Sequence, residues 1–208
     1  MKQKLDIETW ERREHFKLFN QFEEPFYGVC VNVDCTEAYR RAKEKKVSFF
    51  LYYLYKALGA AQLVAPFRYG IEGDEVFIYD QIDAGLTIAR PNGTFGYGLI
   101  LYHPNFDQYM LGAMKEVEQV QSTTDLARTA ATNIIRFSAL PWINFTSVSH
   151  ARMFSVKDSI PRISFGKMTV MDGKRNMPLS IHVHHALVDG LHVGQYIDCF
   201  QQLMNEGV

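Results

Sequence analysis

The chain has 208 residues and a formal net charge of −1, with 47% hydrophobic and 22% charged residues. This length and balance are ordinary for a globular domain with a sizeable core, so we expect a single domain over residues 1–208. The near-neutral charge argues against a nucleic-acid-binding protein, which would carry a basic excess.

The N-terminal residues and the cysteines restrict where the protein works. Residues 1–6 (MKQKLD) provide no apolar segment for a signal peptide, and no apolar run is long enough to span a bilayer. Cys30, Cys35 and Cys199 are odd in number and lack the spacing of a metal or redox site. We therefore expect a cytoplasmic protein that uses neither a membrane nor a metal.

The first half of the chain predicts helices and strands in alternation. Residues 6–20 are charged and aromatic, and we expect part of this segment to be helical. Residues 26–33 alternate, which predicts a strand, and residues 34–37 have the form of a capping box that opens a helix. Ser48 can cap a second helix over residues 49–62, which is apolar nearly all round and is predicted to be buried.

The middle of the chain predicts further strands and one long amphipathic helix. Strands are expected over residues 75–79, 86–89 and 95–102, with a turn at residues 91–93. A helix is expected to follow Asn105. Its apolar stripe consists of Phe106, Met110, Met114 and Val117.

Polar and turn residues separate this helix from the last strands. Residues 123–132 are predicted to form a loop. Residues 162–170 and 177–184 are predicted to form a hairpin across the turn Asp172-Gly173. Strands interspersed with amphipathic helices predict a two-layer α/β sandwich, in which helices pack on a mixed β-sheet.

The segment from residue 180 to residue 190 holds most of the chain's reactive side chains. Its first half alternates, so that Ser180, His182 and His184 share one strand face and apolar residues occupy the other. After Gly190 the spacing becomes helical, with an apolar set that consists of Val193, Tyr196, Ile197, Phe200 and Met204. The histidines therefore end a strand, and a short turn leads into the last helix.

This junction suits a catalytic site, because rigid elements hold the side chains on both sides. His185 has the parity of the apolar face and points inward if the strand continues, and an imidazole there can act as a general base. Asp189 lies near the helix start, where the helix dipole favours a carboxylate. Two other interpretations stay open: a core histidine with a capping aspartate, and a zinc pair of His182 and His184, which lacks further ligands nearby.

Three separated segments resemble the chloramphenicol acetyltransferase family. Residues 184–190 (HHALVDG) resemble the HHxxxDG signature, which this family shares with 2-oxo-acid dehydrogenase acyltransferase cores and peptide-synthetase condensation domains. Residues 10–16 (WERREHF) resemble the WxRxEHF segment of the chloramphenicol acetyltransferases, and residues 138–145 (SALPWINF) resemble their SALPWxxF segment. Because all three occur in the family's order, the chain is identified as a member of that family or a close relative.

The resemblance implies an acetyl-CoA-dependent O-acetyltransferase that acetylates a hydroxyl of chloramphenicol and so inactivates the antibiotic. It implies that His185 is the general base and that Ser138 hydrogen-bonds the oxyanion during direct transfer, without an acyl-enzyme. Asp189 corresponds to an aspartate that pairs with Arg12 and holds the active-site turn. A turn hydroxyl for Ser138 and a surface charge for Arg12 remain open as alternatives.

The resemblance also implies binding residues and an assembly. Acetyl-CoA is the co-substrate, and Trp142, Lys167 and Ser164 stand where the family binds it, although Trp142 and Lys167 can equally be rim or core residues. The acceptor pocket corresponds to Phe19, Tyr27, Phe95 and His150. The family is a homotrimer in which the histidine of one subunit faces the acceptor pocket of the next. No nucleic acid, membrane or metal is implied.

The acceptor half of the chain departs from the family. Polar or charged residues stand where the family has apolar or aromatic ones, namely His150, Arg152, Asp158 and Arg162. Charge in a pocket for a neutral nitroaromatic diol is costly unless it is paired. The same chemistry on a different small-molecule acceptor therefore stays open, as does a non-catalytic CoA-binding relative. A dehydrogenase-complex core would need lipoyl and linker domains, for which the chain has no room.

Overall fold

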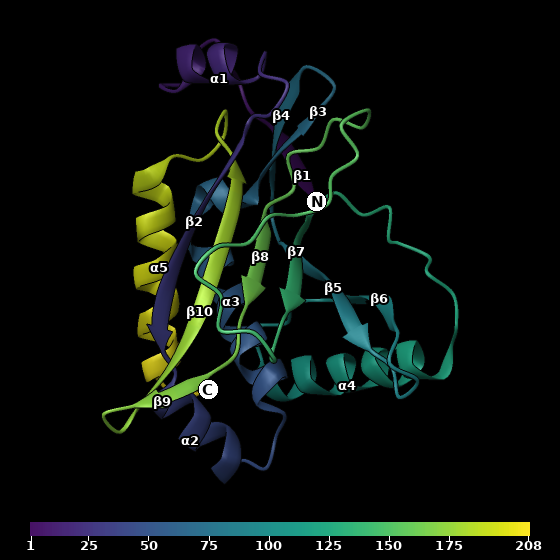
Figure 1. The fold of residues 1–208 in the computed structure, drawn as a ribbon. Coiled ribbons are helices and arrows are strands. Elements are labelled where there is room, and N and C mark those ends of the chain that lie inside the picture. The colour runs from purple at the N-terminus through teal and green to yellow at the C-terminus, as the bar shows by residue number, and fades with distance from the viewer.

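The computed structural model describes residues 1–208 and has two layers, with helices on one face of a large sheet (Figure 1). The elements in chain order are β1 (Lys2–Lys4), α1 (Arg13–Phe19), β2 (Phe26–Asp34), α2 (Thr36–Glu44), α3 (Phe49–Leu63), the 3-10 helix η1 (Ala65–Arg68), β3 (Tyr69–Glu72), β4 (Glu75–Tyr79), β5 (Asp83–Ala89), β6 (Phe95–Ile100), α4 (Phe106–Ser122), β7 (Ile134–Ala139), β8 (Arg162–Phe165), β9 (Thr169–Met171), β10 (Lys174–His184) and α5 (Gly190–Asn205). None of the helices combines the length and the hydropathy needed to traverse a bilayer.

The large sheet has seven strands and is mixed. Its strand order is β2-β10-β8-β7-β5-β6, and β9 pairs with β10. β10 runs antiparallel to β2 and β8, whereas β7 runs parallel to β8 and β5. A smaller antiparallel sheet has the order β1-β4-β3. The predicted two-layer α/β sandwich with a mixed sheet is confirmed.

The alternation along β10 places one apolar face of the sheet in the core. Ile181 and Val183 are fully buried on this face, as their parity predicts. From α5, Tyr196 turns inward, and its ring stacks on Phe67 with the centroids 4.3 Å apart. Burying side chains of this size stabilises the fold by about 1.5–3 kcal/mol each. The opposite face of the same strands carries polar side chains, which belong to the functional site.

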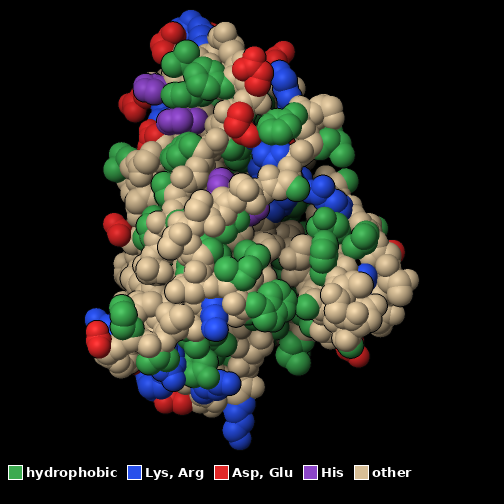
Figure 2. Space-filling model, viewed as in Figure 1, with side chains coloured by type: hydrophobic (Ala, Val, Ile, Leu, Met, Phe, Trp, Pro, Cys, Tyr) green, Lys and Arg blue, Asp and Glu red, His purple; other side chains and the backbone are tan.

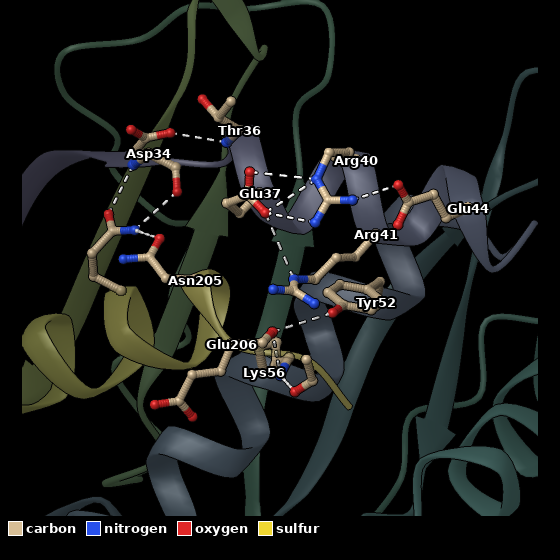
Figure 3. A network of polar contacts seen from close by, with 12 residues as sticks. Asp34, Thr36, Glu37, Arg40, Arg41, Glu44, Tyr52, Lys56, Asn205 and Glu206 are labelled. Carbon is tan, nitrogen blue, oxygen red and sulfur yellow. Dashed lines mark hydrogen bonds and ion pairs between the residues drawn. The ribbon is translucent and has the colours of Figure 1, made fainter.

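A polar network fastens the C-terminus at the end of the molecule away from the β10–α5 turn (Figures 1 and 3). Lys56 of α3 is almost fully buried, and its Nζ donates to the carbonyl oxygens of Gly207 (2.7 Å) and Glu206 (3.3 Å). Burial lowers the pKa of Lys56 to about 8. On α2, Arg40 forms ion pairs with Glu37 and Glu44. The Arg40 pairs stay within α2, whereas Lys56 holds the residues after α5 against α3 and leaves the N-terminus of α5 for the site.

Several local predictions need correction. The predicted strands omit β1, β3 and β7. The capping box over residues 34–37 is wrong: Cys35 is the N-cap and its side chain makes no cap bond, whereas Asp34 accepts the backbone N–H of Thr36 at 2.9 Å. The predicted stripe of α4 is wrong at Met114, which is exposed, because Ala113 is the residue that faces the core.

Candidate active site

The turn between β10 and α5 begins at the first residue after the strand. The strand stops at His184, which is buried, and His185 opens the turn and is half-buried. His185 was expected to point into the core if the strand continued through it. The strand does not continue, because the chain leaves the sheet at this residue. The backbone N–H of His185 donates to the carbonyl oxygen of Pro25 at 2.8 Å, which fixes the turn against the start of β2.

Two aromatic rings hold the imidazole of His185. Phe19 of α1 stacks on it with the centroids 3.9 Å and the planes 7° apart, and the Tyr27 ring of β2 lies 4.6 Å away at a tilt. Nδ1 of His185 is sealed from solvent without a hydrogen-bond partner, whereas Nε2 is not sealed. This packing presents Nε2 as the nitrogen that an incoming hydroxyl can reach.

Asp189 fixes the turn that follows His185. It is the N-cap of α5, and its Oδ1 accepts the backbone N–H groups of Leu191 (3.1 Å) and His192 (3.4 Å). Its Oδ2 pairs with Arg12, whose guanidinium also donates to the carbonyl oxygen of His185 at 3.4 Å. Arg12 directly precedes α1, the helix whose phenylalanine stacks on the imidazole. One ion pair thus joins that helix to the turn that carries His185.

His184 is the last residue of β10, buried on the polar face of that strand, and it is held neutral. Its Nδ1 accepts the backbone N–H of Ala186 at 3.3 Å, and the ring of Phe26 meets it edge-on at 5.4 Å. Burial, together with the nearby charge of Arg152, lowers the pKa of His184 to about 4. The two adjacent histidines therefore differ in environment: His184 is a packed structural side chain, and His185 is the accessible one.

Ser138 lies near the end of β7 in a cavity of about 200 Å³. Strands β5, β6, β7 and β8 contribute to its walls, together with Arg128 and Thr129 before β7 and with His150 and Ala151 between β7 and β8. The Ser138 hydroxyl makes no hydrogen bond and is not sealed from solvent, so it is free to donate to a ligand.

Ser138 and His185 of one chain lie in different parts of the sheet. In the strand register Ser138 of β7 pairs with Ser164 of β8, and Ser164 pairs with Ser180 of β10. Ser180 therefore lies two strands away from Ser138. His185 follows Ser180 by five residues, which corresponds to roughly 17 Å along the strand direction, in addition to about 10 Å across two strands. The fold therefore does not bring the predicted base and the predicted oxyanion donor together within one chain.

Charged and imidazole side chains gather around the Ser138 cavity. The guanidinium of Arg162 is buried and donates to both carboxylate oxygens of Asp158 (2.9 and 3.2 Å), while Arg136 reaches Asp158 only at 3.5 Å. The rings of His150 and His182 meet edge-on at 4.8 Å. Burial and the neighbouring His182 and Arg162 lower the pKa of His150 to about 4. In Figure 2 the visible histidines lie in the upper half of the molecule, whereas Lys and Arg side chains occur in both halves.

Comparison with known proteins identifies the family. The sequence model of the family described as "Chloramphenicol acetyltransferase" matches residues 2–201. The chain belongs to the chloramphenicol acetyltransferase family. Chloramphenicol acetyltransferase 3 of Escherichia coli is 28% identical over 205 residues, which cover 97% of this chain and 96% of that protein. The chloramphenicol acetyltransferase of Proteus mirabilis is 29% identical over 208 residues, which cover 98% of this chain and 94% of that protein.

Solved structures agree with this assignment. A chloramphenicol acetyltransferase structure has a TM-score of 0.91 and 32% identity, and the match covers 98% of this chain and 100% of that one. A dihydrolipoamide acetyltransferase of Azotobacter vinelandii shares the fold alone, with a TM-score of 0.67 and 15% identity over 93% and 86% of the two chains. The resemblance found in the three sequence segments is confirmed, and with it the prediction of an acyltransferase enzyme family.

Three of the four predicted acceptor residues of this chloramphenicol acetyltransferase relative fall into two groups. Phe19 and Tyr27 lie against His185 of their own chain. His150 lines the Ser138 cavity. Phe95 is 46% exposed at the start of β6 and does not line that cavity, although Tyr97, two residues on, does. The structure therefore brings His150 to Ser138 and brings Phe19 and Tyr27 to His185, whereas Phe95 joins neither group.

The predicted cofactor residues also divide. Trp142 is 74% exposed, and Lys167 is exposed on the loop after β8, where its backbone N–H donates to the carbonyl oxygen of Ile143 at 2.8 Å. These two side chains lie on adjoining loops and are open to a ligand. Ser164 is fully buried and its Oγ has no partner, so this residue offers no surface to a cofactor.

No group of three or more His, Cys, Asp or Glu side chains is placed so that it could hold a metal ion, and His182 and His184 belong to no such group. The sequence-based predictions of site residues omit most of the cavity lining, including Arg128, Arg136 and Tyr97. A signal exists for Arg136 alone, because this charged residue interrupts the apolar run Ile134-Ile135-Arg136-Phe137.

Proposed function

We propose that the protein transfers the acetyl group of acetyl-CoA to a hydroxyl of chloramphenicol. The observation that carries this proposal is the imidazole of His185, which is stacked on Phe19 with Nε2 open to solvent. A base oriented before the substrate arrives is effective because its geometry needs no adjustment in the transition state. The relatives named chloramphenicol acetyltransferases, which match nearly the whole chain, support the same acceptor.

The proposed reaction is a direct transfer. Nε2 of His185 removes the proton of the acceptor hydroxyl as that oxygen attacks the thioester carbon, and the former carbonyl oxygen gains a negative charge. Ser138 Oγ–H donates a hydrogen bond to this oxyanion. When the intermediate collapses, the C–S bond breaks and the CoA sulfur takes the proton from the imidazolium. A general base contributes about 10²–10⁴-fold and one oxyanion donor about 10²–10³-fold.

The site is completed between subunits. Because Ser138 and His185 of one chain stand far apart in the strand register, each can act only with its counterpart from another copy. A cyclic homotrimer, in which His185 of one subunit faces the Ser138 cavity of the next, satisfies this requirement at every interface. Exposed apolar side chains between β7 and β8 support such an assembly. They are Trp142, Ile143, Met153, Phe154 and Val156, each 51–74% exposed.

Acetyl-CoA is the co-substrate in this proposal, and Trp142 and Lys167 bind it. An indole offers an apolar surface for the pantetheine arm or the adenine, and an ammonium group pairs with phosphate. The loop that carries Trp142 continues directly from the end of β7. A thioester placed at Ser138 would therefore leave the rest of the cofactor free to follow this loop outward.

Release of free CoA thiol from acetyl-CoA, with and without chloramphenicol, tests the proposal. The wild-type protein is expected to show chloramphenicol-dependent release, and His185→Ala to lose at least about 10²-fold in rate while it still binds acetyl-CoA. His103→Ala, which removes an exposed imidazole before α4, is the matched control and should keep full activity.

Three outcomes would contradict parts of this proposal. Most of the activity remaining in His185→Ala would exclude this residue as the base. Binding of acetyl-CoA without any release would identify a non-catalytic CoA-binding relative. Release only with other hydroxyl compounds would leave the chemistry and exclude chloramphenicol as the acceptor.

A further inference from the structure

The walls of the Ser138 cavity carry a positive charge that they do not neutralise. Arg128, Arg136 and Arg162 line the cavity, and no carboxylate does. Asp158 lines a neighbouring cavity, from which it pairs closely with Arg162 and more loosely with Arg136. The cavity walls thus hold three guanidinium groups, and the one neighbouring carboxylate pairs with only two of them.

Two of these guanidinium groups keep unused hydrogen-bond donors. Arg136 makes one side-chain hydrogen bond, to Asp158 at 3.5 Å, and its side chain is 32% exposed. Arg128 makes none, and its guanidinium lies over the ring of Tyr97 at 5.3 Å. Arg162 is different, because Asp158 and the carbonyl oxygen of Ile160 occupy its N–H groups. Arg136 and Arg128 thus offer free donors in the cavity of the Ser138 hydroxyl.

The histidines near the cavity do not offset this charge. Burial lowers the pKa of His182, and the charge of Arg162 lowers it further, so the imidazole is neutral at neutral pH. His150 is neutral for the same reasons. The His182 ring is also fixed in place, because it lies over Gly28, where an added Cβ would stand 2.3 Å from Nε2. The cavity therefore keeps a net positive charge next to rigid neutral rings.

We propose that this pocket selects acceptor hydroxyl compounds that carry a carboxylate or phosphate group, which Arg136 and Arg128 bind. This inference rests on the proposed function, since it names the acceptor class of the same site. A guanidinium group binds either anion through two parallel N–H···O bonds, which supply both charge and orientation. A neutral acceptor would shield both arginines from water without pairing them, which costs free energy. Anionic acceptors are therefore used in preference to chloramphenicol.

The anion in this cavity belongs to the acceptor rather than to the cofactor. The thioester must reach Ser138 if that hydroxyl stabilises the oxyanion. The whole pantetheine arm separates the thioester of acetyl-CoA from its phosphates, so the phosphates cannot share the cavity with Ser138. Trp142 and Lys167, the exposed candidates for contacts with the cofactor, do not line this cavity.

Two matched pairs of probes test the charge preference: 4-(hydroxymethyl)benzoate against 4-(hydroxymethyl)benzamide, and glycerol 3-phosphate against glycerol. Titration calorimetry on the wild-type assembly should show that the anionic member of at least one pair binds about 10- to 100-fold more tightly. Arg136→Gln should abolish this preference. Arg40→Gln, which removes an exposed guanidinium on α2 by the same substitution, should preserve it. Added salt should weaken the binding of the anionic probe only.

Thiol release measured in parallel separates this inference from the proposed function. Equal binding of anionic and neutral probes, or binding of neither, refutes the anion site even where chloramphenicol supports acetyl transfer. A clear preference in binding without release from any acceptor supports the anion site and refutes acetyl transfer. A raised KM for acetyl-CoA in Arg136→Gln, with unchanged binding of the probes, would assign the arginine to the cofactor and overturn the proposal.

Discussion

Asp189→Ala removes two supports of the active-site turn at once. It deletes the N-cap of α5, whose carboxylate accepts two backbone N–H groups, and it leaves the guanidinium of Arg12 without its partner. Burial works to raise the pKa of Asp189, but the charges of His192 and Arg12 hold it below the usual value, so the carboxylate is ionised at neutral pH. The wild-type pair is therefore a charged one.

The expected loss in free energy of unfolding for Asp189→Ala is the sum of these two contributions. Loss of an N-cap costs about 1 kcal/mol. The ion pair is partly exposed, at 15% for Arg12 and 31% for Asp189, so its loss costs about 1–2 kcal/mol, less than a fully buried pair. Asp189→Ala should therefore lower the free energy of unfolding by about 2–3 kcal/mol, whereas Asp189→Asn, which keeps a capping oxygen, should lower it by about 1–2 kcal/mol.

Urea unfolding at one fixed protein concentration measures these differences, because the stability of an oligomer depends on concentration. A double-mutant cycle with Arg12→Gln should give a coupling energy of about 1 kcal/mol or more between Arg12 and Asp189. An Asp189→Ala variant within about 0.5 kcal/mol of the wild type would refute the structural role of this carboxylate.

Three further changes have defined outcomes. The pKa of His184 is about 4 in the folded chain. As the pH falls from 6.5 to 5, the unfolded chain binds this proton and the folded chain does not, so this residue lowers the free energy of unfolding by about 1.5 kcal/mol. Urea unfolding at the two pH values measures the drop, and an equal drop in His184→Gln would contradict this cause. Gly28→Ala should lower the melting temperature, because the added Cβ meets the ring of His182. Gly112→Ala should raise the melting temperature, because the space around this helical glycine is open and alanine favours the helix. The reverse order of the two melting temperatures would contradict the packing. Ser138→Ala should lower kcat by about 10²–10³-fold in the thiol-release assay with little change in the KM for acetyl-CoA, and a loss below about tenfold would exclude Ser138 as the oxyanion donor.

Long segments with a strong pattern were predictable from the sequence. The change from period two along β10 to helical spacing in α5 locates the turn, and the apolar composition of α3 matches its burial. β7 was not predictable, because a short run that contains Arg136 becomes a strand only through its parallel pairing with β5 and β8. Met114 was assigned to the core by hydrophobicity, but the helix turns its smaller neighbour Ala113 inward.

The site was predictable where it is local and not where it is assembled from distant segments. The alternation of apolar and polar residues along β10 could not show that the strand ends at His184. The ladder stops there because the next residue of the partner strand is Pro25, which has no N–H to donate. The pairing of Arg12 with Asp189 was implied by the family resemblance alone. The cluster of Arg136, Arg162 and Asp158 depends on the sheet register, which no local pattern contains.

Mixing two impaired variants tests most directly that His185 of one subunit acts with Ser138 of the next. His185→Ala and Ser138→Ala are co-expressed with different affinity tags, and doubly tagged assemblies are purified and assayed for thiol release. Every cyclic trimer that contains both variants restores both residues at one of its three interfaces, so the expected activity of the doubly tagged assemblies is about one third of the wild-type value. Mixed assemblies no more active than the two parent variants would contradict the shared site, because His185 and Ser138 would then have to act within the same subunit.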